Sequence, residues 1–302
     1  MSSSIQIASP SENFSTLTSR YFKSKASSLY IFRKSWVPIS TPPRAVLYLV
    51  HGYAEHCSRY ERFGTFLSNN GIALHAFDWE ANGQSEGEVR CYIPRIQNVA
   101  DDLIQLATEV SPSPPGVPRF LLGHSTGGVV ALQVLQKLQQ PFFSGAIFTS
   151  IALYIDPSMD NAFNRLMGNA LLSVWPTLAA VRGIPSGSIS NDPEVAYIYD
   201  NDALVYHGDV RIATGMEIKA LTEKGREADY LKQIKLPVSI FAYSEDKVVN
   251  VQGSEHLRTN VGSSDVSYRV FDGKEGGHEL LFEQVYPQVH ADIISFIERL
   301  SK

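Results

Sequence analysis

Short apolar runs alternate with longer amphipathic segments through the first half of the chain. The apolar runs, which are typical of strands covered by helices on both faces, lie at 45–50, 72–77, 120–122 and 145–149. Between them, 60–68 and 98–110 carry apolar residues at helical spacing. This alternation of strand and helix predicts an α/β fold, with a mostly parallel central sheet flanked by crossover helices.

The strand patterns continue toward both ends of the chain. Residues 14–18 and 28–32 are rich in β-branched and aromatic types, so we expect them to open the sheet as an antiparallel pair. Near the C-terminus, the pattern predicts two further strands and a last helix, at 237–243, 266–271 and 285–300. The sheet is therefore expected to contain residues from both ends of the chain.

The alternation stops between residues 151 and 230. No clear strand pattern occurs there, so we expect a mostly helical cap inserted after the sixth strand, with 14–150 and 231–302 forming the core. Within this segment, the apolar residues of 163–175 fall on one helical stripe. Two interpretations of the stripe stay open: an ordinary amphipathic helix packed on the core, or an apolar lid over a binding site.

Composition narrows the class of protein. The chain has 302 residues, 44% of them hydrophobic and 19% charged, which is typical of a globular protein with a large core. A formal net charge of −5 offers no basic field, so we predict no nucleic-acid partner. Two cysteines, Cys57 and Cys91, cannot form a disulfide framework and favour a reducing, cytoplasmic location. Residues 1–13 are rich in serine and lack a basic or long apolar region, so we expect a disordered N-terminus rather than a signal peptide.

A Gly-x-Ser-x-Gly motif follows the central strand directly. Gly123 and Gly127 flank Ser125, and an apolar helical pattern comes next, which suits a sharp turn that presents a serine hydroxyl. The alternative is a glycine-rich surface turn without chemistry. A serine hydroxyl is a poor nucleophile near neutral pH and needs a histidine base that a carboxylate orients. Nucleophilic catalysis at Ser125 therefore requires both partners elsewhere in the chain.

Two later loops offer these partners. Asp246 comes just after one predicted strand and His278 follows the last one, so both lie at carboxyl ends of strands, as Ser125 does. The order serine, acid, histidine is that of the α/β-hydrolase layout. In this layout the backbone amides of Tyr53 and Thr126 would form the oxyanion hole.

Other assignments of the acid and the base stay open. Asp272 and Glu245 are rival acids, because each lies near one of the two loops. His51 and His124, two of eight histidines, flank the reactive centre and suit structural roles better. Gly83-x-x-x-Gly87 lacks the strand-turn-helix spacing of a nucleotide loop, and no residue cluster has metal-ligand spacing, so we predict neither a cofactor nor a metal.

The motifs together resemble a known family, the monoacylglycerol lipase and lysophospholipase family of α/β-hydrolases, which is grouped with serine aminopeptidase S33. The resemblance extends from about Val46 to Ile297 and rests on three segments: His51-Gly52-x-x-Glu55-His56-x-x-Arg59-Tyr60, Asp78 with Gly83-Gln84-Ser85-Glu86-Gly87, and Leu122-Gly123-His124-Ser125-x-Gly127-Gly128. It implies an α/β-hydrolase fold and a serine esterase that cleaves single-chain lipid esters, or a small-ester substrate, beneath a helical cap. The implied triad is Ser125, Asp246 and His278.

The same resemblance implies substrate contacts. The glycerol end of the substrate would contact Glu55, Arg59 and Tyr199. The alternative is that these residues have structural roles, with a Glu–Arg pair that braces the loop and a packed tyrosine. The acyl chain would lie along the cap stripe, and Leu171 and Trp175 on that stripe would allow peripheral membrane contact.

The chain departs from the family pattern at three positions. Ala81-Asn82-Gly83 replaces Gly-His-Gly, Tyr53 replaces a small residue, and Leu281 stands where mammalian monoacylglycerol lipases have a second histidine. A lysophospholipase, another carboxylesterase or an acyltransferase would use the same machinery. The alternative to an enzyme is a lipid-binding protein of this fold that has no catalytic activity.

Overall fold

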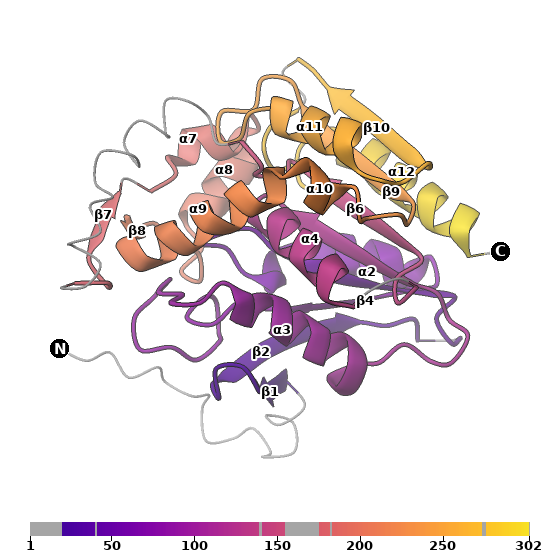
Figure 1. Cartoon of the computed structure of the whole chain (residues 1–302), viewed down its shortest axis with the longest axis horizontal. Helices are drawn as coiled ribbons and strands as arrows, with labels where there is room; N and C mark the ends of the chain where they lie inside the picture. Colours follow the sequence, from indigo (N-terminus) through magenta and orange to yellow (C-terminus); the bar gives the residue numbers. More distant parts are fainter. Residues whose placement is uncertain are drawn as a thin grey trace.

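An eight-stranded sheet runs through the molecule, with helices on both faces (Figure 1). The computed structural model describes residues 20–39, 41–138, 141–154, 175–181, 183–273 and 276–301. The strand order is β1-β2-β4-β3-β5-β6-β9-β10. The strands are β1 (Tyr21–Lys23), β2 (Tyr30–Trp36), β3 (Ala45–Val50), β4 (Ile72–Phe77), β5 (Arg119–His124), β6 (Gly145–Thr149), β9 (Val238–Tyr243) and β10 (Val266–Phe271). From β4 to β10 every neighbouring pair is parallel, which confirms the predicted fold class.

The antiparallel opening of the sheet is present, but its first strand differs from the prediction. β2 pairs antiparallel with β1 on one side and with β4 on the other. Its predicted partner, 14–18, lies outside the described residues, and Tyr21–Lys23 takes the pairing instead. Three residues are too few to show a strand alternation, so the pattern alone could not locate β1.

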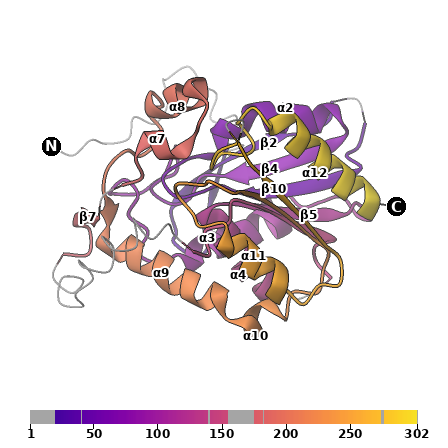
Figure 2. The same ribbon diagram turned by 90° about the horizontal axis from the view of Figure 1, so that it is seen from above.

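Alternation along the strands divides the core into two layers. In β3, Val46, Tyr48 and Val50 face one layer, and the intervening residues face the other. Two helices cover one face, α2 (Glu61–Asn69) and α12 (Tyr286–Leu300); the other face carries α3 (Gln97–Gln105), α4 (Thr126–Leu138) and α11 (Gln252–Asn260). Figure 2 shows these two groups on opposite sides of the sheet. Short helical segments η1 (Cys57–Tyr60) and η2 (Leu106–Val110) precede α2 and continue α3.

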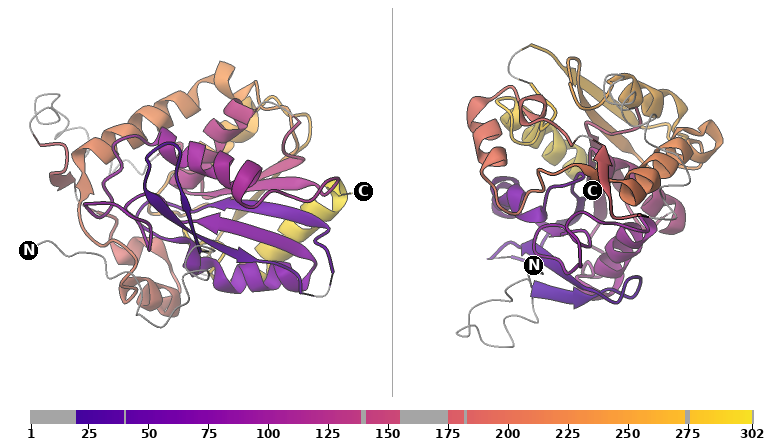
Figure 3. Two further views of the ribbon diagram at one scale, coloured as in Figure 1. Left: turned by 90° about the horizontal axis from the view of Figure 1, so that it is seen from below. Right: turned by 90° about the vertical axis from the view of Figure 1, so that its left-hand side faces the viewer.

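Much of the described part of the segment between β6 and β9 lies on the left in Figure 1 and faces the viewer in the right panel of Figure 3. Its helices within the described residues are α7 (Ser186–Ile189), α8 (Pro193–Asp200), α9 (Ile212–Arg226) and α10 (Ala228–Leu231). Beside these helices, the segment contains two short strands that its sequence pattern does not show: β7 (Ala179–Val181) pairs antiparallel with β8 (Val210–Arg211). These strands are held by pairing with a distant segment, which a local pattern does not reveal. The 163–175 stripe, apart from Trp175, lies outside the described residues.

Candidate active site

Ser125 sits at a sharp bend between β5 and α4. Its φ of 54° lies in the left-handed region, which a non-glycine residue seldom adopts outside functional turns. Both motif glycines are required by close packing: a Cβ on Gly123 would lie 2.5 Å from Gly128 Cα, and one on Gly127 would lie 2.2 Å from the His51 carbonyl oxygen. The Gly-x-Ser-x-Gly sequence therefore fixes the bend that presents Ser125.

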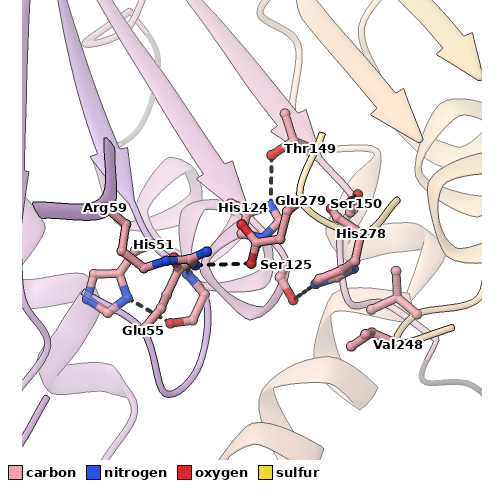
Figure 4. Close-up of polar contacts among 12 residues, drawn as sticks. His51, Glu55, Arg59, His124, Ser125, Thr149, Ser150, Val248, His278 and Glu279 are labelled. Carbon is pink, nitrogen blue, oxygen red and sulfur yellow. Dashed lines mark hydrogen bonds and ion pairs between the residues drawn. The ribbon is translucent and has the colours of Figure 1, made fainter. Parts of the chain in front are cut away.

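His278 and Asp246 lie next to this serine. His278 Nε2 is 3.0 Å from Ser125 Oγ (Figure 4). On its other side, His278 Nδ1 is 2.8 Å from Asp246 Oδ2, so the three side chains form one hydrogen-bonded line. The other carboxylate oxygen, Asp246 Oδ1, accepts hydrogen bonds from the amides of Val248 and Val249 at 2.8 and 3.0 Å. These two donors fix the orientation of the carboxylate.

Burial and charge act in opposite directions on His278. Burial opposes the protonated form, but the neighbouring carboxylates of Asp246, Glu279 and Glu55 outweigh it, and the pKa of His278 lies above its ordinary value. Ser150 Oγ donates a hydrogen bond to the His278 carbonyl oxygen at 2.7 Å, which holds the loop in place. His278 is thus an imidazole that gains a proton readily at a fixed position.

The rival acids lie elsewhere. Glu245 accepts a hydrogen bond from the Tyr243 hydroxyl at 3.2 Å, and Asp272 is exposed on its loop. The flanking histidines bond to neighbours: His124 Nδ1 lies 3.0 Å from Thr149 Oγ1, and His51 Nε2 accepts from the Trp79 amide at 3.2 Å. Sequence reasoning thus singled out the acid and the histidine that the structure brings together with Ser125.

The two predicted oxyanion donors, Tyr53 and Thr126, belong to segments that lie near Ser125. Thr126 begins α4, and the first amides of a helix have no intrahelical acceptor and carry the positive end of the helix dipole. Tyr53 belongs to the loop after β3, where a Cβ on Gly52 would come within 3.3 Å of Ser125 Cβ. Both amides are therefore near the serine, and their role as oxyanion donors stays a prediction.

The residues predicted to meet the glycerol end contact one another. Arg59 Nη1 donates to Glu55 Oε2 at 2.6 Å, and the guanidinium carbon lies 4.9 Å from the centre of the Tyr199 ring. Glu55 Oε1 also accepts from the Gly52 amide and the Tyr60 hydroxyl. The structure thus contains the bracing pair and the packed tyrosine, and substrate contact stays a prediction for all three residues.

One buried carboxylate was missed by sequence reasoning. Glu279 Oε1 accepts from Arg59 Nη1 at 3.1 Å and lies 3.8 Å from His124 Nε2. The oxygens of Glu55 and Glu279 and a nitrogen of His124 lie within 4.8 Å of one another, a spacing that could hold a metal ion. The Arg59 guanidinium already supplies the positive charge between the two carboxylates, so this group is an ion-pair network. Its only sequence signal is that Glu279 directly follows His278.

A serine on a left-handed strand-to-helix bend, bonded to a histidine and an acid from later loops, defines a serine hydrolase of the α/β-hydrolase class. The chain belongs to the family Hydrolase_4, serine aminopeptidase S33, whose model matches residues 41–285. This match confirms the predicted family.

Similar proteins agree with this assignment. The chain is 29% identical over 266 residues to the monoglyceride lipase of Rattus norvegicus, covering 88% of this chain and 84% of that protein. It is 29% identical to the monoacylglycerol lipase of Mycolicibacterium smegmatis, covering 87% and 90%. The structure of a soluble variant of monoglyceride lipase from Saccharomyces cerevisiae superimposes with a TM-score of 0.82 at 19% identity, covering 99% and 98%. That likeness shows the shared fold.

Proposed function

We propose that the chain hydrolyses carboxylic esters of single-chain lipids, in particular monoacylglycerols, through an acyl-enzyme on Ser125. The observation that carries the proposal is the hydrogen-bonded line from Ser125 through His278 to Asp246 at the left-handed bend. The substrate class is supported by the similarity to monoacylglycerol lipases over most of both chains.

The reaction proceeds in two halves. His278 Nε2 takes the proton of Ser125 Oγ as the oxygen attacks the ester carbonyl carbon, and the amides of Tyr53 and Thr126 stabilise the resulting oxyanion. The ester C–O bond then breaks, His278 gives its proton to the leaving alcohol, and the acyl group stays on Ser125. Water then attacks the acyl carbon while His278 takes a proton from it. The bond between the acyl carbon and Ser125 Oγ breaks, His278 returns the proton to Ser125 Oγ, and the fatty acid leaves. Asp246 keeps His278 in the tautomer that leaves Nε2 free to accept.

The segment 151–230 acts in this proposal as the cap that receives the acyl chain, with Leu171 and Trp175 among its contacts. Trp175, Tyr197 and Ile198 are exposed there by 61, 68 and 57%, which supports peripheral contact with a lipid surface. Among the helices of the described residues, none is both long and apolar enough to cross a bilayer. Co-sedimentation with vesicles should fall in Trp175→Ala combined with Ile198→Glu; unchanged binding would contradict the membrane contact.

The free, buried cysteines Cys57 and Cys91 support a cytoplasmic location. Cell fractionation tests it, and recovery of the protein with secreted markers would contradict it.

A hydrolysis panel tests the reaction and the substrate class together. Monoacylglycerols, lysophospholipids and short p-nitrophenyl esters are compared, with Ser125→Ala as the blank. We expect the highest kcat/KM with monoacylglycerols, and Ser125→Ala should hydrolyse no ester faster than buffer alone. Faster turnover of lysophospholipids would change the substrate class, and acyl transfer to an added alcohol in preference to water would make the protein an acyltransferase. Failure of a fluorophosphonate probe to label Ser125 would refute the enzyme and favour the silent lipid-binding alternative.

A further inference from the structure

The ion-pair network beside the active site carries a surplus negative charge. Arg59 Nη1 contacts Glu55 Oε2 at 2.6 Å and Glu279 Oε1 at 3.1 Å, and all three side chains are at least nine-tenths buried. One guanidinium therefore faces two carboxylates. Burial disfavours the charged forms of Glu279 and Arg59, but their attraction prevails: the pKa of Glu279 lies well below its ordinary range, and the pKa of Arg59 lies above its own.

This surplus charge lies close to the imidazole. Glu279 is the next residue after His278, and its carboxylate lies 3.8 Å from His124 Nε2. The ring of His124 in turn lies 5.0 Å from that of His278, measured between centroids. Figure 4 shows the Glu279 carboxylate between the Arg59 guanidinium and the Ser125–His278 pair in that view. Because the groups are buried, water screens this charge only weakly.

We propose that Glu279 is a positioning residue whose surplus negative charge stabilises the imidazolium form of His278, and that Arg59 limits this effect. The proposal rests on the proposed function, in which His278 becomes positively charged each time it takes the proton of Ser125. Asp246 supplies the direct hydrogen bond, and Glu279 adds a second negative charge through space.

The two members of the network should act in opposite directions. Glu279→Gln leaves a neutral Glu55–Arg59 pair, so His278 binds its proton less tightly and the acidic limb of the rate profile moves to lower pH. Arg59→Met leaves two carboxylates without their counter-charge, so the acidic limb moves to higher pH. If Glu279 and Arg59 had only a structural role, both variants would react more slowly, but the acidic limbs of their rate profiles would not move apart.

The other titratable groups facing this site come from several elements and stay unchanged in both variants. They are Asp246 and Glu283 in the loops around His278, His124 at the end of β5, Glu55 and Tyr60 after β3, and Tyr199 on α8. Because Glu279 also acts on Glu283, whose pKa burial raises to about 7, a shift of the acidic limb is assigned to His278 by following its imidazole directly.

The test is the rate of Ser125 labelling by a fluorophosphonate probe as a function of pH, which requires no lipid substrate. We expect Glu279→Gln to lower the midpoint of the acidic limb by about one pH unit. Arg59→Met should raise the midpoint by less, because two buried carboxylates without their counter-charge hold a proton more tightly and so lose part of their negative charge. Asp272→Asn, which removes an exposed carboxylate from the same loop, is the matched control and should not move the limb. An unchanged midpoint in Glu279→Gln, or shifts of both variants in one direction, would overturn the proposal.

Two further measurements separate the possible failures. NMR titration of the His278 imidazole, with Ser125→Ala as the common background, reports the same shifts without any reaction. Absence of labelling in the wild type would contradict the proposed function, while the titration would still decide the role of Glu279. If Arg59→Met does not fold, which its thermal transition would show, the comparison of the limb midpoints of Glu279→Gln and Asp272→Asn decides whether Glu279 acts on His278.

Discussion

Replacing Asp246 by asparagine changes which atom faces His278. In the wild-type protein, Asp246 Oδ1 accepts hydrogen bonds from the amides of Val248 and Val249, and Oδ2 lies 2.8 Å from His278 Nδ1. An asparagine side chain has one acceptor oxygen and one donor NH2 group. The two backbone donors will keep the oxygen on their side, so the NH2 group will face His278.

That orientation selects the wrong tautomer of the base. A donor opposite Nδ1 requires Nδ1 to accept, so the imidazole proton moves to Nε2, which lies 3.0 Å from Ser125 Oγ. Nε2 can then no longer take the serine proton. The equivalent change in a serine protease triad lowers kcat about 10⁴-fold, which corresponds to about 5 kcal/mol of transition-state stabilisation. We expect a loss of this order here.

The assay is kcat for a p-nitrophenyl ester together with the thermal midpoint of each variant. Asp246→Asn should retain its fold, since the asparagine keeps both backbone hydrogen bonds, and Asp272→Asn should behave as the wild type. If Asp246→Asn kept more than about a tenth of the wild-type kcat, the argument from the tautomer would be refuted.

Four further results are expected. Gly127→Ala should lower the free energy of unfolding by about 3 kcal/mol or more in urea denaturation, because the new Cβ would lie 2.2 Å from the His51 carbonyl oxygen. Gly187→Ala, where a Cβ meets nothing within 4 Å, should be neutral or stabilising, and equal effects would contradict the packing argument. Burial raises the pKa of Asp102 to about 7, above its value in the unfolded chain. Between about pH 4 and 7 the folded protein therefore keeps a proton that the unfolded chain loses, and the free energy of unfolding should fall as the pH rises through this range. Asp102→Asn should remove that part of the slope in denaturation between pH 4 and 8, whereas exposed Asp229→Asn should not. Burial raises the pKa of Cys91 to about 12 and that of Cys57 well above its ordinary value, so neither should react with iodoacetamide at pH 8 until the protein unfolds.

The sequence could predict that the serine, a carboxylate and the base lie at one edge of the sheet, because this depends on strand order. Parallel strands place their carboxyl ends at one edge of a sheet, and Ser125, Asp246 and His278 each follow such a strand. In the strand order, β6 separates β5 from β9, and β10 lies next to β9. Side chains from these three loops can therefore meet once the sheet forms.

Features that depend on distant pairing could not be found in this way. The strands β7 and β8 have three and two residues, and only their mutual hydrogen bonds distinguish them from loop. The Arg59–Glu279 ion pair joins residues 220 positions apart, and neither residue belongs to a pattern that marks the other. Their meeting depends on side-chain direction at the ends of two loops, which residue order does not specify.

The choice of the acid shows where sequence order stops and local geometry decides. Asp246 and Asp272 both follow a strand and both precede His278, so position alone left them as rivals. The chain turns after Asp246 so that two successive amides, those of Val248 and Val249, point at one carboxylate oxygen. This turn holds the second oxygen against His278, whereas Asp272 stays exposed on its own loop. The acid is thus set by the backbone turn that follows it, and we expect the loop after β9 to tolerate substitution at Lys247, whose amide is not among these donors, better than insertion of a residue between Asp246 and Val249.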